Sequence, residues 1–387
     1  MRRRTASIVV VVLLIALPLL GIRLAGKPIA PYLAFPPQPG QVAHEPFSWT
    51  AFVTLGTLIV MSVAPLLLHV LVSNYRSAPA GCESSPTTVP QPAFGTRRWL
   101  ERFPWWGWAG LAWVGLWWIL AWTRYPWTTS LQAHTFTPLW LGYILVVNAG
   151  TFARIGRCMM LHRPRYTLSL FPLSAGGWWL FEYLNRFVEN WHYAGIANLS
   201  ALDYAVRATL PFSTVLPAVI GTAELLTACP AVSAGLDRFR VVRLPDTKAI
   251  GWAGLAVACA GLAGLGVWPN AFFPFVWVAP LLLLLSLQLL DGRPTILSPL
   301  ARGDWRNLWV PAVAALTCGF FWELWNWRSL AHWEYAIPYV HGLRLFEMPL
   351  LGYSGYLPFG VTCVVAADFF LDRKFADGAA YYGRGSD

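Results

Sequence analysis

Long apolar stretches without charged residues dominate this chain. Examples are SIVVVVLLIALPLLGI, AFVTLGTLIVMSVAPLLLHVLV and FVWVAPLLLLLSLQLL. An apolar run of about 18 or more residues is long enough to cross the hydrocarbon core of a bilayer as a helix. Charged residues make up only 12% of the sequence, about half the share that is typical of a soluble domain. The sequence therefore predicts an all-α polytopic membrane protein.

Ten stretches are candidate transmembrane helices: residues 7–24, 48–72, 104–123, 135–153, 168–191, 207–229, 249–268, 271–290, 308–330 and 349–370. Cytoplasmic loops are enriched in Lys and Arg, so these residues predict the direction of the helices. With a cytoplasmic N-terminus, most of the 28 Lys and Arg residues fall on the inner side. We therefore expect a multi-pass protein of the cell inner membrane with both termini in the cytoplasm. The net charge of +10 then reflects this topology and anionic membrane lipid, and no nucleic-acid partner is expected.

The first two spans form an N-terminal unit, residues 1–76. MRRR followed by an apolar run fits either an uncleaved signal-anchor or a cleaved signal peptide, and we favour the anchor because no clear A-x-A site follows. Residues 27–47 are rich in proline, which disfavours a helix and predicts an extended outer loop. Residues 77–103 are expected to be a cytoplasmic linker.

The common cofactor motifs are missing from the sequence. The six cysteines contain no C-x-x-C pair, and no histidines stand at metal-ligand spacing. The sequence also has no P-loop, no G-x-G-x-x-G and no H-E-x-x-H. We expect no metal site and no other cofactor.

An internal repeat follows the linker. GWAGLA, E-x-x-N, W-x-Y and S-x-x-L-P occur twice in the same order and at a nearly constant separation. The repeat divides the chain into a four-helix unit at residues 104–229 and a second one at 249–370, joined by a cytoplasmic segment at 230–248 and followed by a tail at 371–387. An even number of spans in each unit gives both copies the same direction, which predicts two tandem parallel four-helix repeats related by an axis along the membrane normal.

Each repeat places a carboxylate and an amide near the outer end of a span. Glu182 and Asn185 match Glu323 and Asn326, and Arg186 and Glu189 extend the first copy at helical spacing. A charged side chain inside a membrane is costly and marks a functional site by default. We predict catalytic roles for the two glutamates in a tryptophan-lined outer pocket. The predicted substrate-binding residues are Asn185, Asn326, Arg186, Arg328, Trp179, Trp322 and His192.

A structural role for the same residues remains open. Glu182 and Arg186 have the spacing of an ordinary helical ion pair, and tryptophan N–H groups or asparagine amides can satisfy a buried glutamate between helices. Duplication preserves packing contacts as well as functional ones, so the repeat alone does not separate the two roles.

Three classes of function fit these features. The first is an enzyme or binder for a lipophilic small molecule such as an isoprenoid or a lipid, the second a transporter or channel for a small solute, and the third a non-catalytic scaffold of a membrane complex. The acidic residues gather in the outer half, which favours the first class. Membrane lipid is the expected surrounding partner. Whether the protein is an enzyme, and its oligomeric state, stay open at this stage.

Overall fold

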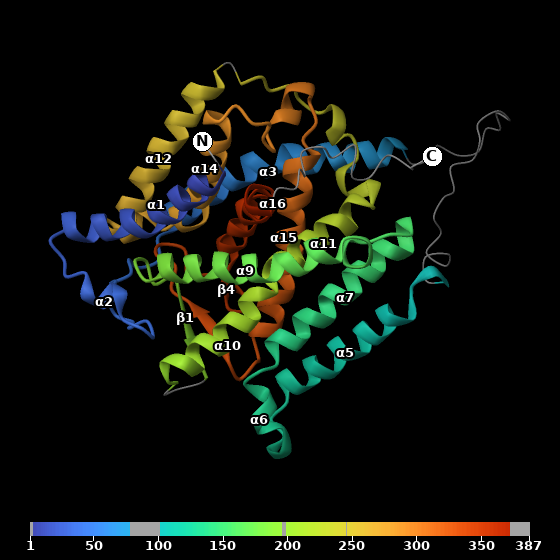
Figure 1. Ribbon diagram of the computed structural model, residues 1–387, viewed down its shortest axis with the longest axis horizontal. Helices are drawn as coiled ribbons and strands as arrows, with labels where there is room; N and C mark the ends of the chain where they lie inside the picture. Colours follow the sequence, from blue (N-terminus) through green and yellow to red (C-terminus); the bar gives the residue numbers. More distant parts are fainter. Residues whose placement is uncertain (1–2, 78–100, 196–198, 245, 372–387) are drawn as a thin grey trace.

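The computed structural model describes residues 3–77, 101–195, 199–244 and 246–371. It is mostly helical (Figure 1), which confirms the predicted all-α class. Within these residues, seven helices are long and apolar enough to cross a membrane. Most of the predicted linker at 77–103 and nearly all of the tail at 371–387 lie outside the described residues.

The N-terminal part consists of α1 (Arg3–Leu24), the short α2 (Ala30–Leu33) and α3 (Trp49–Ser77). Helix α1 packs against α12 (Thr247–Val267). Glycines allow a close approach, because a Cβ atom on Gly21 would collide with the carbonyl of Ala263. Most large apolar side chains of α3 are exposed, as expected for a helix that faces lipid.

The next helices are α5 (Trp105–Trp122), α6 (Thr129–Gln132, after the 3-10 turn η1, Pro126–Thr128) and α7 (Phe136–Ile155). Helices α5 and α7 lie side by side (Figure 1). Gly156 ends α7 in the left-handed conformation (φ 71°), which glycine adopts without steric cost. The short α8 (Met159–His162) leads into α9 (Pro164–Asn185).

Helix α9 ends earlier than predicted. We expected a span to residue 191, but the helix ends at Asn185 and Glu189 adopts φ 48° in the turn that follows. Glu189 is therefore outside the helical stripe that its spacing suggested. The chain continues into the strand β1 (Trp191–Ala194), which the sequence analysis did not anticipate.

The sixth predicted span is two helices, α10 (Ala201–Ser213) and α11 (Val215–Thr227). Pro217 has no N–H for the carbonyl four residues earlier, and this favours a break near Thr214. Ser174 of α9 satisfies the interrupted backbone, since its hydroxyl donates to Phe212 O at 2.5 Å and accepts from Leu216 N at 3.0 Å. The 3-10 turns η2 (Pro230–Ser233) and η3 (Leu236–Arg238) follow.

Helix α12 begins after Asp246, whose side chain accepts hydrogen bonds from Lys248 N and Ala249 N. It packs against α14 (Phe275–Leu290) beyond the short α13 (Pro269–Phe272). After the 3-10 turn η4 (Ser298–Arg302) comes α15 (Arg306–Asn326), which packs against the last helix. That part of the chain contains β2 (His332–Tyr335), β3 (Arg344–Leu345), β4 (Met348–Pro349), η5 (Leu350–Gly355) and α16 (Tyr356–Leu371).

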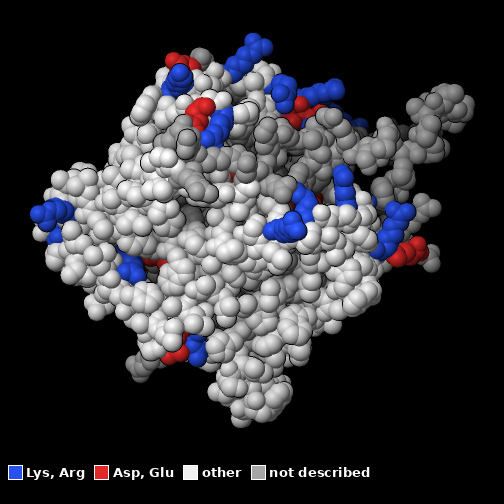
Figure 2. Space-filling view, viewed as in Figure 1, with Lys and Arg blue, Asp and Glu red and all other residues white. Residues whose placement is uncertain are grey.

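The surface is poor in charge. Broad stretches of the face in Figure 2 carry no Lys, Arg, Asp or Glu. The core that joins the helices is rich in aromatic rings; Trp140, for example, packs against Trp322 and Trp325 with ring centroids 5.0 and 5.1 Å apart. A low-charge exterior over an aromatic interior fits a helical bundle whose solvent is lipid.

Candidate functional site

Two strands join the E-x-x-N segments of the chain. Strand β1 follows α9, strand β2 follows α15, and the two pair in antiparallel fashion. Trp191 lies opposite Tyr335, and Tyr193 lies opposite Trp333. The W-x-Y motif that occurs twice in the sequence therefore pairs with its own copy, and each tryptophan faces the tyrosine of the other copy.

The two asparagines hold these strands in the same way. Asn185 donates through Nδ2 to Trp191 O at 2.7 Å and accepts from Trp191 N at 3.3 Å. Asn326 donates to Trp333 O at 2.7 Å and accepts from Trp333 N at 2.8 Å. Each amide thus binds both backbone groups of the tryptophan that follows it, which turns the chain back over the helix end.

Glu182 is buried and binds the side chains of its own strand. Its Oε1 accepts from Trp191 Nε1 at 2.9 Å and from Tyr193 Oη at 2.5 Å. The carboxylate therefore fixes two aromatic rings that alternate with His192 along β1. The sequence-based alternative, in which Arg186 pairs with Glu182, does not appear among the ion pairs of the described residues.

Glu323 has the corresponding position in the second copy and is fully buried. Its Oε1 accepts from Tyr335 Oη and from Tyr356 Oη, each at 2.7 Å. Trp333 Nε1 donates to Tyr335 Oη at 2.7 Å, so the indole is bound through the phenol. Among the described residues, Glu323 Oε2 has no hydrogen-bond partner.

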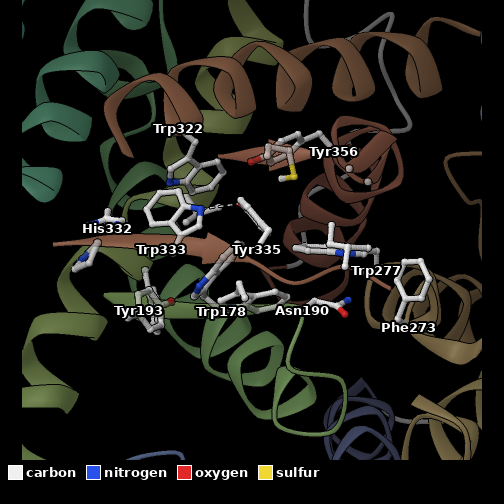
Figure 3. Close-up of a pocket in the computed structure, with 18 of the residues that line it drawn as sticks. Trp178, Asn190, Tyr193, Phe273, Trp277, Trp322, His332, Trp333, Tyr335 and Tyr356 are labelled. Carbon is white, nitrogen blue, oxygen red and sulfur yellow. Dashed lines mark hydrogen bonds between the residues drawn. The ribbon is translucent and has the colours of Figure 1, made fainter. Parts of the chain in front are cut away.

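A cavity of about 410 Å³ lies beside the paired strands. In Figure 3 the indole rings of Trp322 and Trp333 lie on one side, Trp178 lies on another, and Tyr335 lies between them. Helices α3, α10, α14 and α16, the segment before β4 and the 3-10 turn η5 also contribute to the wall. The aromatic lining residues are Phe136, Trp178, Trp191, Tyr193, Tyr204, Phe212, Phe273, Trp277, Trp322, Trp333, Tyr335 and Tyr356.

The carboxylates lie behind this wall. Neither Glu182 nor Glu323 lines the cavity, but the tyrosines that donate to them do. Burial raises the pKa of Tyr193 and Tyr335 well above the usual value, and the negative charge of the neighbouring glutamate adds to the rise. Both phenols therefore stay protonated and keep donating to the carboxylates.

Two further polar side chains, at the end of α9 and in the turn after it, hold the N-terminal segment. Arg186 donates through Nη1 to Tyr32 O at 3.0 Å and Ala34 O at 2.7 Å. The Glu189 carboxylate accepts from Gly40 N at 3.0 Å and Gln41 N at 2.8 Å. These contacts attach the proline-rich loop to the end of α9, and Arg186 is not among the residues that line the cavity.

The other predicted site residues are dispersed. Trp322 lines the cavity, whereas Trp179 and His192 do not. Trp179 Nε1 donates to Thr209 Oγ1 at 3.0 Å. Arg328 is exposed and lies over the ring of Trp327, with Cζ 4.6 Å from the centroid. Of the nine predicted site residues, the structure thus brings only Trp322 to the cavity wall, and the catalytic role of the glutamates stays a prediction.

The residues that the sequence analysis missed are the tyrosines and Trp277. Tyr193 and Tyr335 carried a signal, since they end the repeated W-x-Y motif. Trp277 and Tyr356 carried none, because they reach the cavity from helix starts that are distant in sequence from the E-x-x-N motifs.

Comparison with known protein families, characterised proteins and solved structures finds no match to this chain. Its function has to be inferred from the geometry of the cavity and of the groups around it.

Proposed function

We propose that this protein binds a lipophilic small molecule in the aromatic cavity, at the outer surface of the membrane. The observation that carries the proposal is the composition of the wall: about 410 Å³ lined mostly by aromatic and aliphatic side chains, with few polar groups. Binding sites for apolar molecules have this character. The paired glutamates and asparagines support the wall, because they fix the strands and tyrosines that form it.

We further propose the tandem-repeat architecture with ten transmembrane helices. The candidate spans are α1, α3, α5, α7, α9, α10 with α11, α12, α14, α15 and α16. The packing of α5 on α7 resembles that of α12 on α14, and α9 contacts α11 as α15 contacts α16. The strand register supports a twofold axis, since exchanging the two copies of W-x-Y leaves the pairing unchanged. Such an axis through the strand pair runs along the membrane normal when both units have the same direction.

The position of the cavity favours binding over transport. Its wall includes residues from the C-terminal ends of α9 and α15 and from the N-terminal ends of α14 and α16. These ends belong to one side of the bundle, which the Lys and Arg distribution assigns to the outside. A molecule that partitions into the outer leaflet reaches such a site without crossing the protein.

Enzymatic use of the same cavity is a second proposal, favoured by the phenol–carboxylate pairs. Tyr335 and Tyr356 line the cavity and both donate to Glu323, whose second carboxyl oxygen is without a partner among the described residues. A phenol that contacts the ligand and is bonded to a carboxylate is suited to general acid–base chemistry. In this proposal the tyrosines touch the substrate and the glutamate holds the proton behind them.

Filling the cavity tests the binding proposal. Ala208 lines it from α10, and a phenylalanine there occupies the space. Leu210 on the same helix is 53% exposed and is not part of the wall, so Leu210→Phe is the matched control. We expect a lipophilic molecule to remain bound to the wild type and to Leu210→Phe after purification in mild detergent, and to be lost from Ala208→Phe, by mass spectrometry of extracted small molecules. Equal retention by Ala208→Phe and wild type contradicts the proposal.

A further inference from the structure

Arg207 belongs to the described part of the cavity wall, and its guanidinium group has no polar partner there. It lies on α10, within two turns of the helix start that Ser200 caps through a hydrogen bond from Asp203 N. Among the described residues, no hydrogen bond or ion pair engages its guanidinium group, and Nη1 is buried without a partner. A guanidinium has five donors and cannot lose its charge, so burying part of it unpaired is unfavourable.

Three other arginines that are predicted on the same side of the bundle have polar partners within the protein, whereas Arg23 is exposed. Arg124 donates to three backbone carbonyls, Arg186 donates to two, and Arg344 pairs with Glu347 at 3.8 Å. These three guanidinium groups form their hydrogen bonds or ion pairs with other groups of the protein. Arg207 differs because it lines a cavity to which the described residues contribute no Asp or Glu. An anionic group on a bound molecule would supply a partner for this charge.

We propose that Arg207 binds an anionic group of the ligand, so that the ligand is an amphiphile with an acidic end, a phosphate or a carboxylate, and an apolar tail. The inference rests on the proposed binding function and specifies its ligand. The planar fork of a guanidinium matches both anions with two parallel hydrogen bonds. The aromatic wall accommodates the tail beside it.

The surroundings of Arg207 leave its charge uncompensated. Burial lowers the pKa of His134, and the positive charge of Arg207 lowers it further. The imidazole thus stays neutral beside the guanidinium. Asp203 lies one helical turn before Arg207 but forms no ion pair with it among the described residues, so the charge of Arg207 favours an anion at this part of the wall.

The predicted location of Arg207 is consistent with such a ligand. By the Lys and Arg distribution, it stands at the outer boundary of the sixth span, the depth of lipid headgroups. An arginine at this depth commonly extends to the headgroups of the surrounding bilayer. Arg207 instead lines the cavity, where the same interaction favours a bound molecule with an anionic group.

Quenching of tryptophan fluorescence by brominated lipids tests the inference, since five tryptophans line the cavity. The full-length protein in phosphatidylcholine nanodiscs is titrated with dibrominated phosphatidic acid and with diacylglycerol of the same chains. We expect the wild type to bind phosphatidic acid about tenfold to a hundredfold more tightly, the range for a charge-assisted hydrogen bond. Arg207→Gln should remove this difference, Arg207→Lys should keep part of it, and Arg23→Gln, an exposed cation away from the cavity, should keep all of it.

The possible outcomes separate the inference from the proposed function. If the wild type binds both lipids equally, the inference that the ligand has an acidic end is wrong, but the proposed binding of a lipophilic molecule stands. Binding of neither lipid overturns both. If Arg207→Gln keeps the preference for phosphatidic acid over diacylglycerol, another group binds the anion and the inferred role of Arg207 is wrong. Retained binding of diacylglycerol shows that the variant is folded. Inorganic phosphate should not displace phosphatidic acid; complete displacement would mean that the site takes a soluble anion and no tail.

Discussion

His192 and Glu334 lie opposite each other in the two-stranded ribbon, with Nε2 3.4 Å from the carboxylate oxygen. On either side of this pair, a tryptophan of one strand faces a tyrosine of the other. The pair therefore marks the centre of a locally twofold arrangement. Both side chains are about half exposed, at 51% and 45%, and Glu334 also contacts His332 at 3.3 Å. The centre of the ribbon thus carries a solvated polar contact, whereas the aromatic pairs on each side are supported from below by buried residues.

This contrast predicts unequal stability effects. We expect His192→Ala to lower the free energy of unfolding by less than about 1 kcal/mol, because exposed ion pairs contribute little. Asn185→Ala and Asn326→Ala should each cost about 1–3 kcal/mol, because the N–H and C=O groups of a tryptophan lose their partners. Thermal unfolding of the purified protein in one detergent gives the ranking. Similar losses for the two asparagines are expected from their equivalent contacts, and a cost for His192→Ala as large as theirs contradicts the assignment.

The two glutamates offer a test of function against structure. Glu323→Gln keeps the side-chain volume and an oxygen acceptor for Tyr335 and Tyr356 but removes the exchangeable proton. If the cavity is an enzyme site, we expect activity to fall about 10²–10⁴-fold with folding intact. If the carboxylate only orients the phenols, Glu323→Gln should cost roughly 0.5–1.5 kcal/mol of stability and little ligand affinity.

Glu182→Gln serves as the matched variant for that experiment, because Glu182 occupies the same position in the first copy. Ligand affinity and thermal stability are measured for both single variants and for the double variant. A stable double variant that complements a deletion strain fully would exclude catalytic roles for both carboxylates.

Two helix glycines should respond to alanine in opposite directions. A Cβ atom on Gly360 of α16 would collide with the backbone carbonyl of Pro311 in α15, whereas nothing lies within 4 Å of a Cβ on Gly176 in α9. Gly360→Ala should separate α15 from α16 and lower stability by about 1–3 kcal/mol or more, as overpacking does. Gly176→Ala should be neutral or stabilise by up to about 1 kcal/mol through helix propensity. Unfolding temperatures of the two variants in one detergent test this; a neutral Gly360→Ala is inconsistent with the close packing.

Alkaline titration tests the environment of the ribbon tyrosines. Burial and, second, the charge of the nearby glutamate raise the pKa of Tyr193 and Tyr335 above 10. Since the folded pKa exceeds the unfolded one, the contribution to stability is complete below about pH 10 and is lost as the pH rises further. Tyrosinate absorbance should show these two phenols ionising only with unfolding. Tyr193→Phe and Tyr335→Phe each remove one late-titrating group, and an unchanged late absorbance step contradicts the assignment.

The sequence could predict the site only in part. The repeated E-x-x-N and W-x-Y motifs identified the segments that meet, because they recur in the sequence at a nearly constant separation. They could not reveal that the carboxylates point to tyrosine hydroxyls and away from the cavity, since hydrogen-bond partners of a buried group depend on neighbouring helices. Arg186 and Glu189 had the spacing of a helical stripe, but the chain leaves the helix at Asn185 and uses both residues to hold the N-terminal loop.

The apolar character of long segments was readable from the sequence alone, because in lipid the backbone must satisfy its own hydrogen bonds and a long apolar run has to be helical. The helix positions follow from that constraint within a few residues, with the exceptions of the break at Thr214 and the early end of α9. Only the tertiary structure decided that two four-residue strands pair across the bundle and that Trp277, Tyr356 and Arg207 line one cavity. Lipid provides little hydrophobic force between helices, so their arrangement depends on shape and on a few buried hydrogen bonds, which linear spacing does not encode.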